Sequence, residues 1–226
     1  MLFHEAVMFK KSWLAGLGAT LLLAGCCVTE PREKPVAELL VVGDGITCHA
    51  PLPELGWNGD WGMAATSAER DFAHRLLAHI RKKSPDAALR VDGIMYEDTM
   101  TGWVHLLPNH ADVIVIQLGE NYHGGVSADE YCESYARMID ELSEGSSPVV
   151  VCVGTWNRPD VDTIIRRAAE SRNAPFVDLS PIAADPANHA AADGVYPKLN
   201  SRPGDRGMQA IADAVADAVD SRLTVH

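Results

Sequence analysis

Short apolar runs alternate with amphipathic stretches along most of the chain. Continuous apolar runs are typical of strands that are covered on both faces of a parallel sheet. Five short segments are predicted as strands, at residues 38–42, 87–93, 113–116, 148–154 and 174–180, and residues 113–116 are continuously apolar. Apolar side chains at helical spacing predict helices at residues 67–83, 127–144 and 161–172, and from Pro203 or Gly204 to residue 223. Strands that alternate with helices imply a single α/β domain, with a parallel sheet between two layers of helices.

One helix start has a specific signature. Ser127 precedes the segment at 127–144, and Glu130 follows three residues later. A serine and a glutamate at this spacing can cap the free N–H groups of a helix reciprocally. We therefore expect the second of the four helices to begin immediately after Ser127.

The first residues have the layout of a targeting segment. Lys10 and Lys11 precede an apolar run at 13–24, which is too short to span a bilayer comfortably and is typical of a secretory signal peptide. Leu23-Ala24-Gly25-Cys26 resembles the lipobox of bacterial lipoproteins, in which the cysteine matching Cys26 carries the lipid. The expected organisation is a signal peptide at 1–25, a tether at 26–36 and a domain at 37–226. The alternative is an ordinary cleaved signal or a buried apolar helix.

This organisation predicts an exported protein that is anchored to a membrane through a lipid, in the periplasm or at the cell surface. The 226 residues are 47% hydrophobic and 22% charged, which is ordinary for a globular protein. The formal net charge is -12, and no basic cluster follows the first residues, so nucleic acid is not expected as a partner. The five cysteines show no metal-ligand spacing, and neither a metal nor a cofactor is expected.

The loops that follow the strands are where function is sought. In parallel α/β folds, ligands bind outside the carboxyl ends of the strands. After the first four strands, the loops read GDGIT, DGIMYED, GENYHGG and GTWNRPD.

Two of these loops carry a family resemblance. VVGDGIT, and VIVIQLGEN with Asn121, resemble the first and third blocks of the SGNH, or GDSL-like, hydrolases. GWNGDWGMAATSAERDF and PGDRGMQAIADA resemble a subgroup with an aromatic glycine loop after the first block. The resemblance implies a three-layer α/β/α sandwich with a flavodoxin-like parallel sheet of about five strands. It also implies an ester hydrolase ancestry, often with acylated carbohydrates as substrates. By the same resemblance, Asn121 helps to hold the oxyanion.

The chain departs from the family at the two reacting positions. Gly45 stands where the family has its nucleophilic serine. Near the C-terminus, the family has Asp-x-x-His before a proline, and two registers are open. One register keeps Asp193 and places Tyr196 at the histidine, whereas the other places Arg202 there and Leu199 at the aspartate. Neither register supplies a histidine.

These departures predict that serine-type turnover is near background. Glycine cannot attack a carbonyl, tyrosine has a reference pKa near 10, and arginine cannot accept a proton. The oxyanion donors remain: the Gly45 amide, the Asn121 side chain and the Gly93 amide, although Gly93 also fits a simple turn. The resulting hypothesis is a catalytically degenerate protein that binds an acylated or carboxylated small molecule, with carbohydrate as one class of ligand.

Two other functions stay open. The first is an active ester hydrolase with a relocated nucleophile, for which Thr47, Cys48 beside His49, or a bound water are the candidates. The second is a structural lipoprotein of the cell envelope. For ligand contact we single out six residues, of which Asp44 also fixes the turn by local hydrogen bonds and the tryptophans also suit packing of the loops onto the sheet. These are Asp44, Thr47, Trp57, Trp61, Tyr122 and Trp156.

Overall fold

The computed structural model describes residues 35–94, 97 and 110–223. The expected signal peptide at 1–25 and the lipidation site at Cys26 lie outside the described residues, as does the tether up to residue 34. Among the helices within the described ranges, none is long and apolar enough to cross a membrane.

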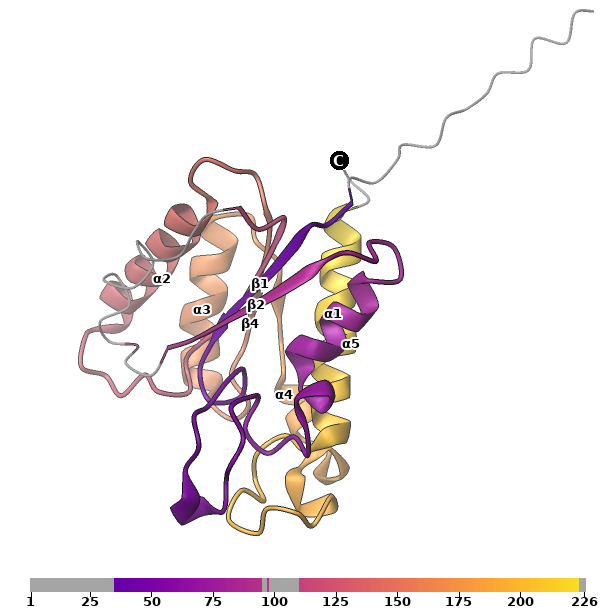
Figure 1. Ribbon diagram of the computed structural model, residues 1–226. Helices are drawn as coiled ribbons and strands as arrows, with labels where there is room; N and C mark the ends of the chain where they lie inside the picture. Colours follow the sequence, from indigo (N-terminus) through magenta and orange to yellow (C-terminus); the bar gives the residue numbers. More distant parts are fainter. Residues whose placement is uncertain (1–34, 95–96, 98–109, 224–226) are drawn as a thin grey trace, which may run out of the picture. The chain divides into compact units, whose positions relative to one another are not determined.

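The centre of the domain is a parallel sheet with the strand order β2-β1-β3-β4-β5 (Figure 1). The strands are β1 (Glu38–Gly43), β2 (Ala88–Gly93), β3 (Val113–Gln117), β4 (Val149–Val153) and β5 (Phe176–Val177). All four neighbouring pairs are parallel. The prediction of a five-stranded parallel sheet is therefore confirmed.

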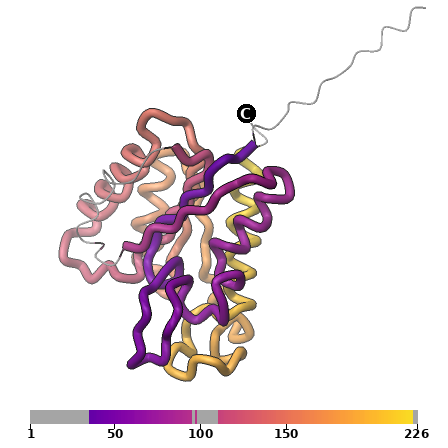
Figure 2. The backbone as a smooth tube through the Cα atoms, viewed as in Figure 1, coloured from indigo at the N-terminus to yellow at the C-terminus, as the bar shows by residue number. Residues whose placement is uncertain are grey.

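Helices cover both faces of this sheet. The helices α1 (Phe72–Ile80) and α5 (Asp205–Leu223) pack together on one face, whereas α2 (Ala128–Ser143) and α3 (Pro159–Ser171) pack together on the other (Figures 1 and 2). Alternate residues of β1 serve the two layers. Leu39 and Val41 join the buried cluster of α1 and α5, and Leu40 and Val42 join that of α2 and α3. Each β1 side chain between Leu39 and Val42 is at most 1% exposed, which explains its continuous apolar run.

The boundaries of several elements differ from the sequence prediction. The segment expected as a helix at 67–83 divides into a short turn of 3₁₀ helix at Ala68–Arg70 and then α1, because the Asp71 side chain caps α1 by accepting from the His74 amide at 2.8 Å. The last helix begins at Asp205 rather than at Pro203 or Gly204, and β5 has only two residues. The predicted capping box at Ser127 and Glu130 is present.

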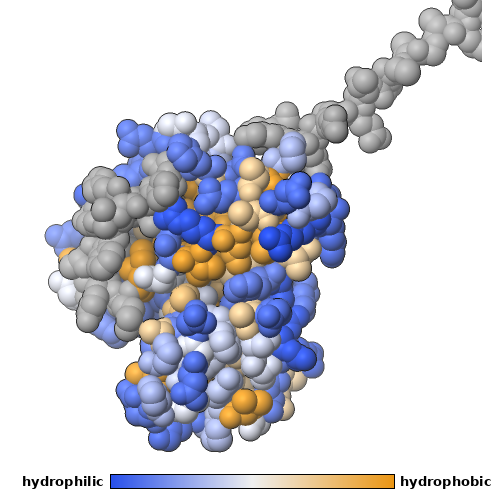
Figure 3. Space-filling view, in the orientation of Figure 1, coloured by the Kyte–Doolittle hydropathy of each residue, from blue (hydrophilic) through white to orange (hydrophobic). Residues whose placement is uncertain are grey.

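The strand order defines where a ligand can enter. β1 and β3 are neighbours, yet the chain leaves β1 toward β2 and leaves β3 toward β4. A crevice forms at such a switch point, outside the carboxyl ends of the strands. In Figure 3, the larger apolar patch on the displayed face lies over β1 and the edge strand β2, where Leu89 and Val91 are partly buried. The loops beyond the strand ends are mostly hydrophilic on this face (Figure 3).

Candidate functional site

A pocket of about 260 Å³ lies at the carboxyl ends of β1 and β3. Three segments line it: the loop after β1, the loop after β3 and the loop before α5. The lining residues are Gly45, His49, Leu52, Leu55, Met63, Asn121, Lys198, Leu199, Ser201 and Arg202. The structure thus brings Gly45, Asn121 and Arg202 to one cavity from positions far apart in the chain.

The turn after β1 presents the backbone of Gly45 to this pocket. The Asp44 carboxylate accepts from the Ile46 amide at 3.1 Å, and the Asp44 carbonyl accepts from the amides of Thr47 and Cys48, both at 2.9 Å. Within the described ranges, the Gly45 N–H has no hydrogen-bond partner, and it remains available to a ligand oxygen. A Cβ atom built on Gly45 would lie 3.4 Å from Cδ2 of His49, with no other described atom outside the adjoining residues within 4 Å.

Asn121 follows β3 and is held by its backbone. Its amide donates to a carboxylate oxygen of Glu97 at 3.2 Å, while its side chain lines the pocket. No protein partner of the Asn121 side-chain amide occurs in the described part of the chain. This amide can therefore donate to a ligand.

The loop before α5 contains both candidates for the position of the family's histidine, Arg202 and Tyr196. Arg202 lines the pocket. The ring of Tyr196 instead packs edge-on against Trp57, with ring centroids 5.3 Å apart, and Tyr196 does not line the pocket. Arg202 is positioned by its neighbour, since the Trp156 indole N–H donates to the Ser201 carbonyl at 2.9 Å.

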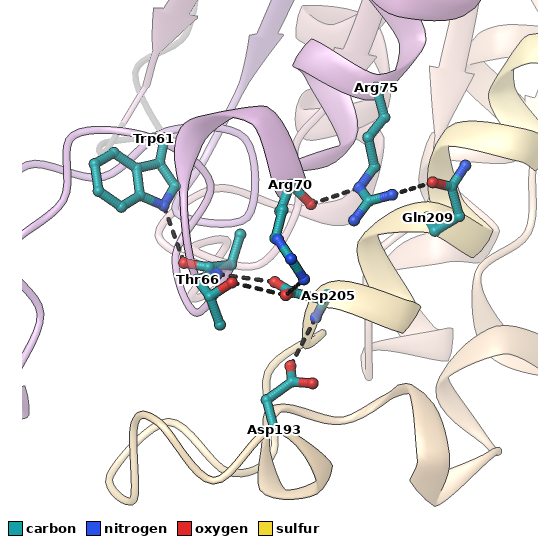
Figure 4. A network of polar contacts seen from close by, with 8 residues as sticks. Trp61, Thr66, Arg70, Arg75, Asp193, Asp205 and Gln209 are labelled. Atoms are coloured by element: carbon teal, nitrogen blue, oxygen red, sulfur yellow. Dashed lines mark hydrogen bonds and ion pairs between the residues drawn. The ribbon is translucent and has the colours of Figure 1, made fainter.

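Asp193 has a structural partner. One of its carboxylate oxygens accepts from the Asp205 amide at 2.7 Å, at the first residue of α5 (Figure 4). The Asp205 side chain in turn accepts from the Thr66 amide and hydroxyl and pairs with Arg70 at 2.7 Å. The Asp193 carboxylate thus caps α5, and Asp205 joins the start of α5 to the loop after β1.

Three carboxyl groups lie together behind the pocket. Asp44 is 1% exposed and its carboxylate accepts from the Glu120 amide at 3.2 Å, while Glu97 is also 1% exposed and its carboxylate accepts from the Tyr131 hydroxyl at 2.9 Å. Burial raises the pKa of Asp44 well above its usual range, and the negative charges of Glu120 and Glu97 raise it further. Burial likewise raises the pKa of Glu97 and that of Glu120, which Arg202 and Arg158 partly offset for Glu120.

The six residues singled out for ligand contact lie behind the pocket wall and do not line it. Five are buried: Asp44, Thr47, Trp57, Tyr122 and Trp156, each at most 8% exposed. Thr47 donates to the Gln117 side chain at 3.1 Å, and the indole of Trp61, which is partly buried, donates to the Ala65 carbonyl at 3.0 Å. Their hydrogen bonds and ring contacts support the loops that carry the lining residues.

Gly93 and Cys48 lie beside each other and outside the pocket lining. A Cβ on Gly93 would contact the backbone and side chain of Cys48 at 3.6–4.0 Å. The Cys48 thiol donates to the Asp60 carbonyl at 3.3 Å. Burial raises the pKa of this thiol, and the charge of Asp60 raises it further, so the nucleophilic thiolate is disfavoured.

His49, Lys198 and Ser201 line the pocket but do not belong to the sequence-predicted site. The Nδ1 atom of His49 lies 2.6 Å from the Ala50 carbonyl, and the Lys198 ammonium donates to the Glu54 carbonyl at 2.6 Å. The sequence offered one signal, since His49 stands four residues after Gly45 across a tight turn. Nothing in the local pattern marks Lys198 or Ser201. No cluster of His, Cys, Asp and Glu able to hold a metal occurs among the described residues.

Comparisons with known proteins give the class of fold. No family model and no curated protein matches the chain. Among solved structures, a two-domain esterase active on acetylated mannans, co-crystallized with mannopentaose, aligns at 16% identity and a TM-score of 0.59, over 84% of this chain and 50% of that one. The chain therefore spans half the length of that esterase.

Two further solved structures, each aligned over nearly its whole length, have a similar fold. The acetyl xylan esterase AlAXEase aligns at 17% identity and a TM-score of 0.56, over 80% of this chain and 99% of that one. A protein of the G-D-S-L family from Desulfitobacterium hafniense aligns at 13% identity and a TM-score of 0.53, over 80% of this chain and 99% of that one. The chain has the three-layer α/β/α fold of the SGNH, or GDSL-like, hydrolases.

Proposed function

We propose that the protein binds a small carboxylated or acylated ligand at the carboxyl ends of β1 and β3, without cleaving it by serine chemistry. The observation that carries the proposal is the composition of the pocket. Gly45 supplies only a backbone N–H at the place of the nucleophile, and Arg202 supplies a fixed positive charge in the same cavity. A site with donors and no serine nucleophile at position 45 suits retention rather than turnover.

The charges at the pocket favour an anion. Lys198 and Arg202 line it, and no carboxylate belongs to its described lining. An arginine presents parallel N–H donors that match the two oxygens of a carboxylate. Two further donors, the Gly45 N–H and the Asn121 amide, suit a second oxygen or an acyl carbonyl. The mannan-active esterase among the similar structures supports an acylated sugar as one ligand class.

The proposal can be tested by calorimetric titration of purified protein with short carboxylates, glucuronate and their methyl esters. Arg202→Gln should weaken carboxylate binding by about tenfold to a hundredfold, because a hydrogen bond to a charged group contributes roughly 1.5–3 kcal/mol. Arg206→Gln is the matched control, since Arg206 is exposed, pairs with Asp185 and does not line the pocket. Equal affinities of wild type and Arg202→Gln would overturn the proposal.

A second candidate function is supported by one specific observation. The His49 imidazole and the Ser201 hydroxyl line the same pocket as the Gly45 and Asn121 donors. Ester hydrolysis through Ser201, or through a water activated by His49, is therefore the rival. Cys48 and Thr47 are weaker candidates for relocated chemistry, because the thiol has a raised pKa and the hydroxyl is buried against Gln117.

The two functions differ in turnover. Acetyl and short-chain aryl esters should be hydrolysed at near-background rates if the protein is a binder. Turnover comparable with that of active esterases, lost in both His49→Gln and Asn121→Ala, would establish the hydrolase instead. Retention of that turnover in Ser201→Ala would then assign the attack to water.

We also propose that Cys26 carries a lipid that anchors the exported protein to the cell envelope. The support is the Leu23-Ala24-Gly25-Cys26 sequence after a basic start and an apolar run. Metabolic labelling with a tritiated fatty acid tests it. Cys26→Ser should abolish the label and release the protein from the membrane fraction, while the adjacent Cys27→Ser should retain both.

A further inference from the structure

The absent side chain at position 45 leaves a space beside an imidazole. His49 Cδ2 would lie 3.4 Å from a Cβ on Gly45, which is an ordinary van der Waals contact, and no other described atom outside the adjoining residues comes within 4 Å. Cδ2 is bonded to Nε2 in the ring. The Cδ2–Nε2 edge of His49 is therefore the nearest side-chain group to the volume that a side chain at position 45 would fill.

The tautomer of His49 is fixed by its other nitrogen. Nδ1 lies 2.6 Å from the Ala50 carbonyl oxygen, which can only accept, so Nδ1 carries the proton. In the neutral ring, Nε2 is then an acceptor. The backbone of His49 is also held on both sides, because its amide donates to the Trp61 carbonyl at 3.0 Å and its carbonyl accepts from the Trp57 indole at 3.0 Å.

The opposite wall lines the pocket with two cationic side chains, of which Arg202 also interacts electrostatically with the carboxyl group of Glu120. Arg202 and Lys198 are cations, and Lys198 uses one of its three N–H donors in a hydrogen bond to the Glu54 carbonyl. In the described part of the chain, the Arg202 guanidinium makes no hydrogen bond. His49 thus supplies a hydrogen-bond acceptor on one side of the pocket. Positive charge and the Asn121 amide donor lie on the other side. We expect this pocket to bind a ligand that has a hydrogen-bond donor near one end and a negative charge at the other.

We propose that the ligand is a short 2-hydroxycarboxylate. Its carboxylate would bind Arg202 and the Asn121 amide, and its hydroxyl would occupy the space at Gly45 and donate to Nε2 of His49. The cavity of about 260 Å³ accommodates a compact ligand of this kind. An amino acid is disfavoured although its ammonium could also donate to His49, because that positive charge would lie beside Lys198 and Arg202 with no carboxylate in the described lining.

This inference rests on the proposed function and narrows it to a substrate class. The test compares three probes of similar size, namely lactate, propionate and alanine, by calorimetric titration of the purified protein at neutral pH. Lactate should bind about fivefold to tenfold more tightly than propionate, which corresponds to one net hydrogen bond of about 1 kcal/mol. Alanine should bind more weakly than either.

Two variants locate the effect. His49→Phe keeps a ring but removes the acceptor, so the affinities for lactate and propionate should become equal in this variant. Gly45→Ala fills the space and should weaken lactate more than propionate. Equal binding of lactate and propionate by the wild type would overturn the inference while the proposed function stands. Binding of none of the carboxylates, including glucuronate, would instead overturn the proposed function.

Discussion

The two walls of the pocket differ in what they retain of a hydrolase. The wall after β1 presents Gly45 and His49, so it keeps the place for a nucleophile and has an imidazole beside it. The wall before α5 presents Lys198 and Arg202, so it carries charge where the SGNH resemblance implies an imidazole. The imidazole of this pocket therefore comes from the loop after β1, whereas the wall before α5 is suited to hold an anion.

The largest expected effect comes from completing the first wall. Gly45→Ser places a hydroxyl beside His49, within a pocket that already has oxyanion donors. Hydrolysis of an activated aryl acetate should rise by about 10²–10⁴-fold, because a positioned general base contributes this much. The rate of ester cleavage in the purified variant measures the gain.

Two controls bear on that result. Gly45→Ala adds the carbon without the hydroxyl and should show no gain, and His49→Gln in the Gly45→Ser background should remove it. If activity appears only after Arg202→His is added to Gly45→Ser, the base position lies on the second wall and the comparison between the walls is wrong.

The two walls are joined by a buried indole, and its removal gives the next largest effect. Trp57 is fully buried, contacts the rings of Trp61 and Tyr196 at 5.3 Å, and lies in one cluster with Met63 and Leu199. Trp57→Ala should lower the free energy of unfolding by about 3–5 kcal/mol. Denaturant unfolding measures the loss, and Trp57→Phe should lose less. A change below 1 kcal/mol would show that the walls do not pack as a unit.

Asp193 offers a smaller and more selective test of the second wall. Its carboxylate caps α5, so Asp193→Ala should destabilise the protein by about 0.5–2 kcal/mol. The affinity for carboxylates should be unchanged, because Asp193 does not line the pocket. Denaturant unfolding and titration on the same preparation separate the two. Weaker binding with unchanged stability would mean that Asp193 serves the site directly.

The smallest effect concerns the carboxyl groups behind both walls. Burial raises the pKa of Asp44, Glu97 and Glu120 in the folded state, so the folded protein binds more protons than the unfolded chain above the ordinary carboxyl range. The stabilisation by these groups is full below their unfolded pKa values and is lost as the pH rises through the folded values.

Glu97→Gln removes one of these charges and should reduce the loss of stability between pH 5 and pH 8 relative to the wild type. Free energies of unfolding at the two pH values measure this. The exposed Glu133→Gln on α2 is the control and should leave the difference as it is in the wild type. An undiminished loss in Glu97→Gln would show that this carboxyl does not contribute to the linkage.

Part of this structure was predictable from the sequence. The apolar runs predicted the strands because burial on both faces demands them, and the blocks around Gly45 and Asn121 lie at strand ends, where a parallel sheet brings them together. The segment at 184–204 has no periodicity, since it consists of turns and short 3₁₀ helices such as Pro186–Asn188 and Ala190–Ala192. Local pattern therefore could not choose between Tyr196 and Arg202.

Other residues depended on tertiary contacts that no local pattern encodes. Asp193 caps a helix twelve residues ahead, and Glu97 holds the Asn121 backbone from another loop. The sequence marks His49 only as a neighbour of Cys48. The tight turn places its ring, rather than the thiol, beside Gly45. The sequence alone leaves Trp57 and Trp156 open between ligand stacking and packing, and both are buried with their indole N–H groups donating to loop carbonyls.

The direction of β1 has a consequence for an anchored protein. The strand begins at Glu38, close after the proposed tether, and its six residues advance by roughly 20 Å toward the pocket at about 3.3 Å each. If Cys26 is lipidated as proposed, the lipid-bearing segment joins the domain at the start of β1, which is the end of the sheet remote from the opening.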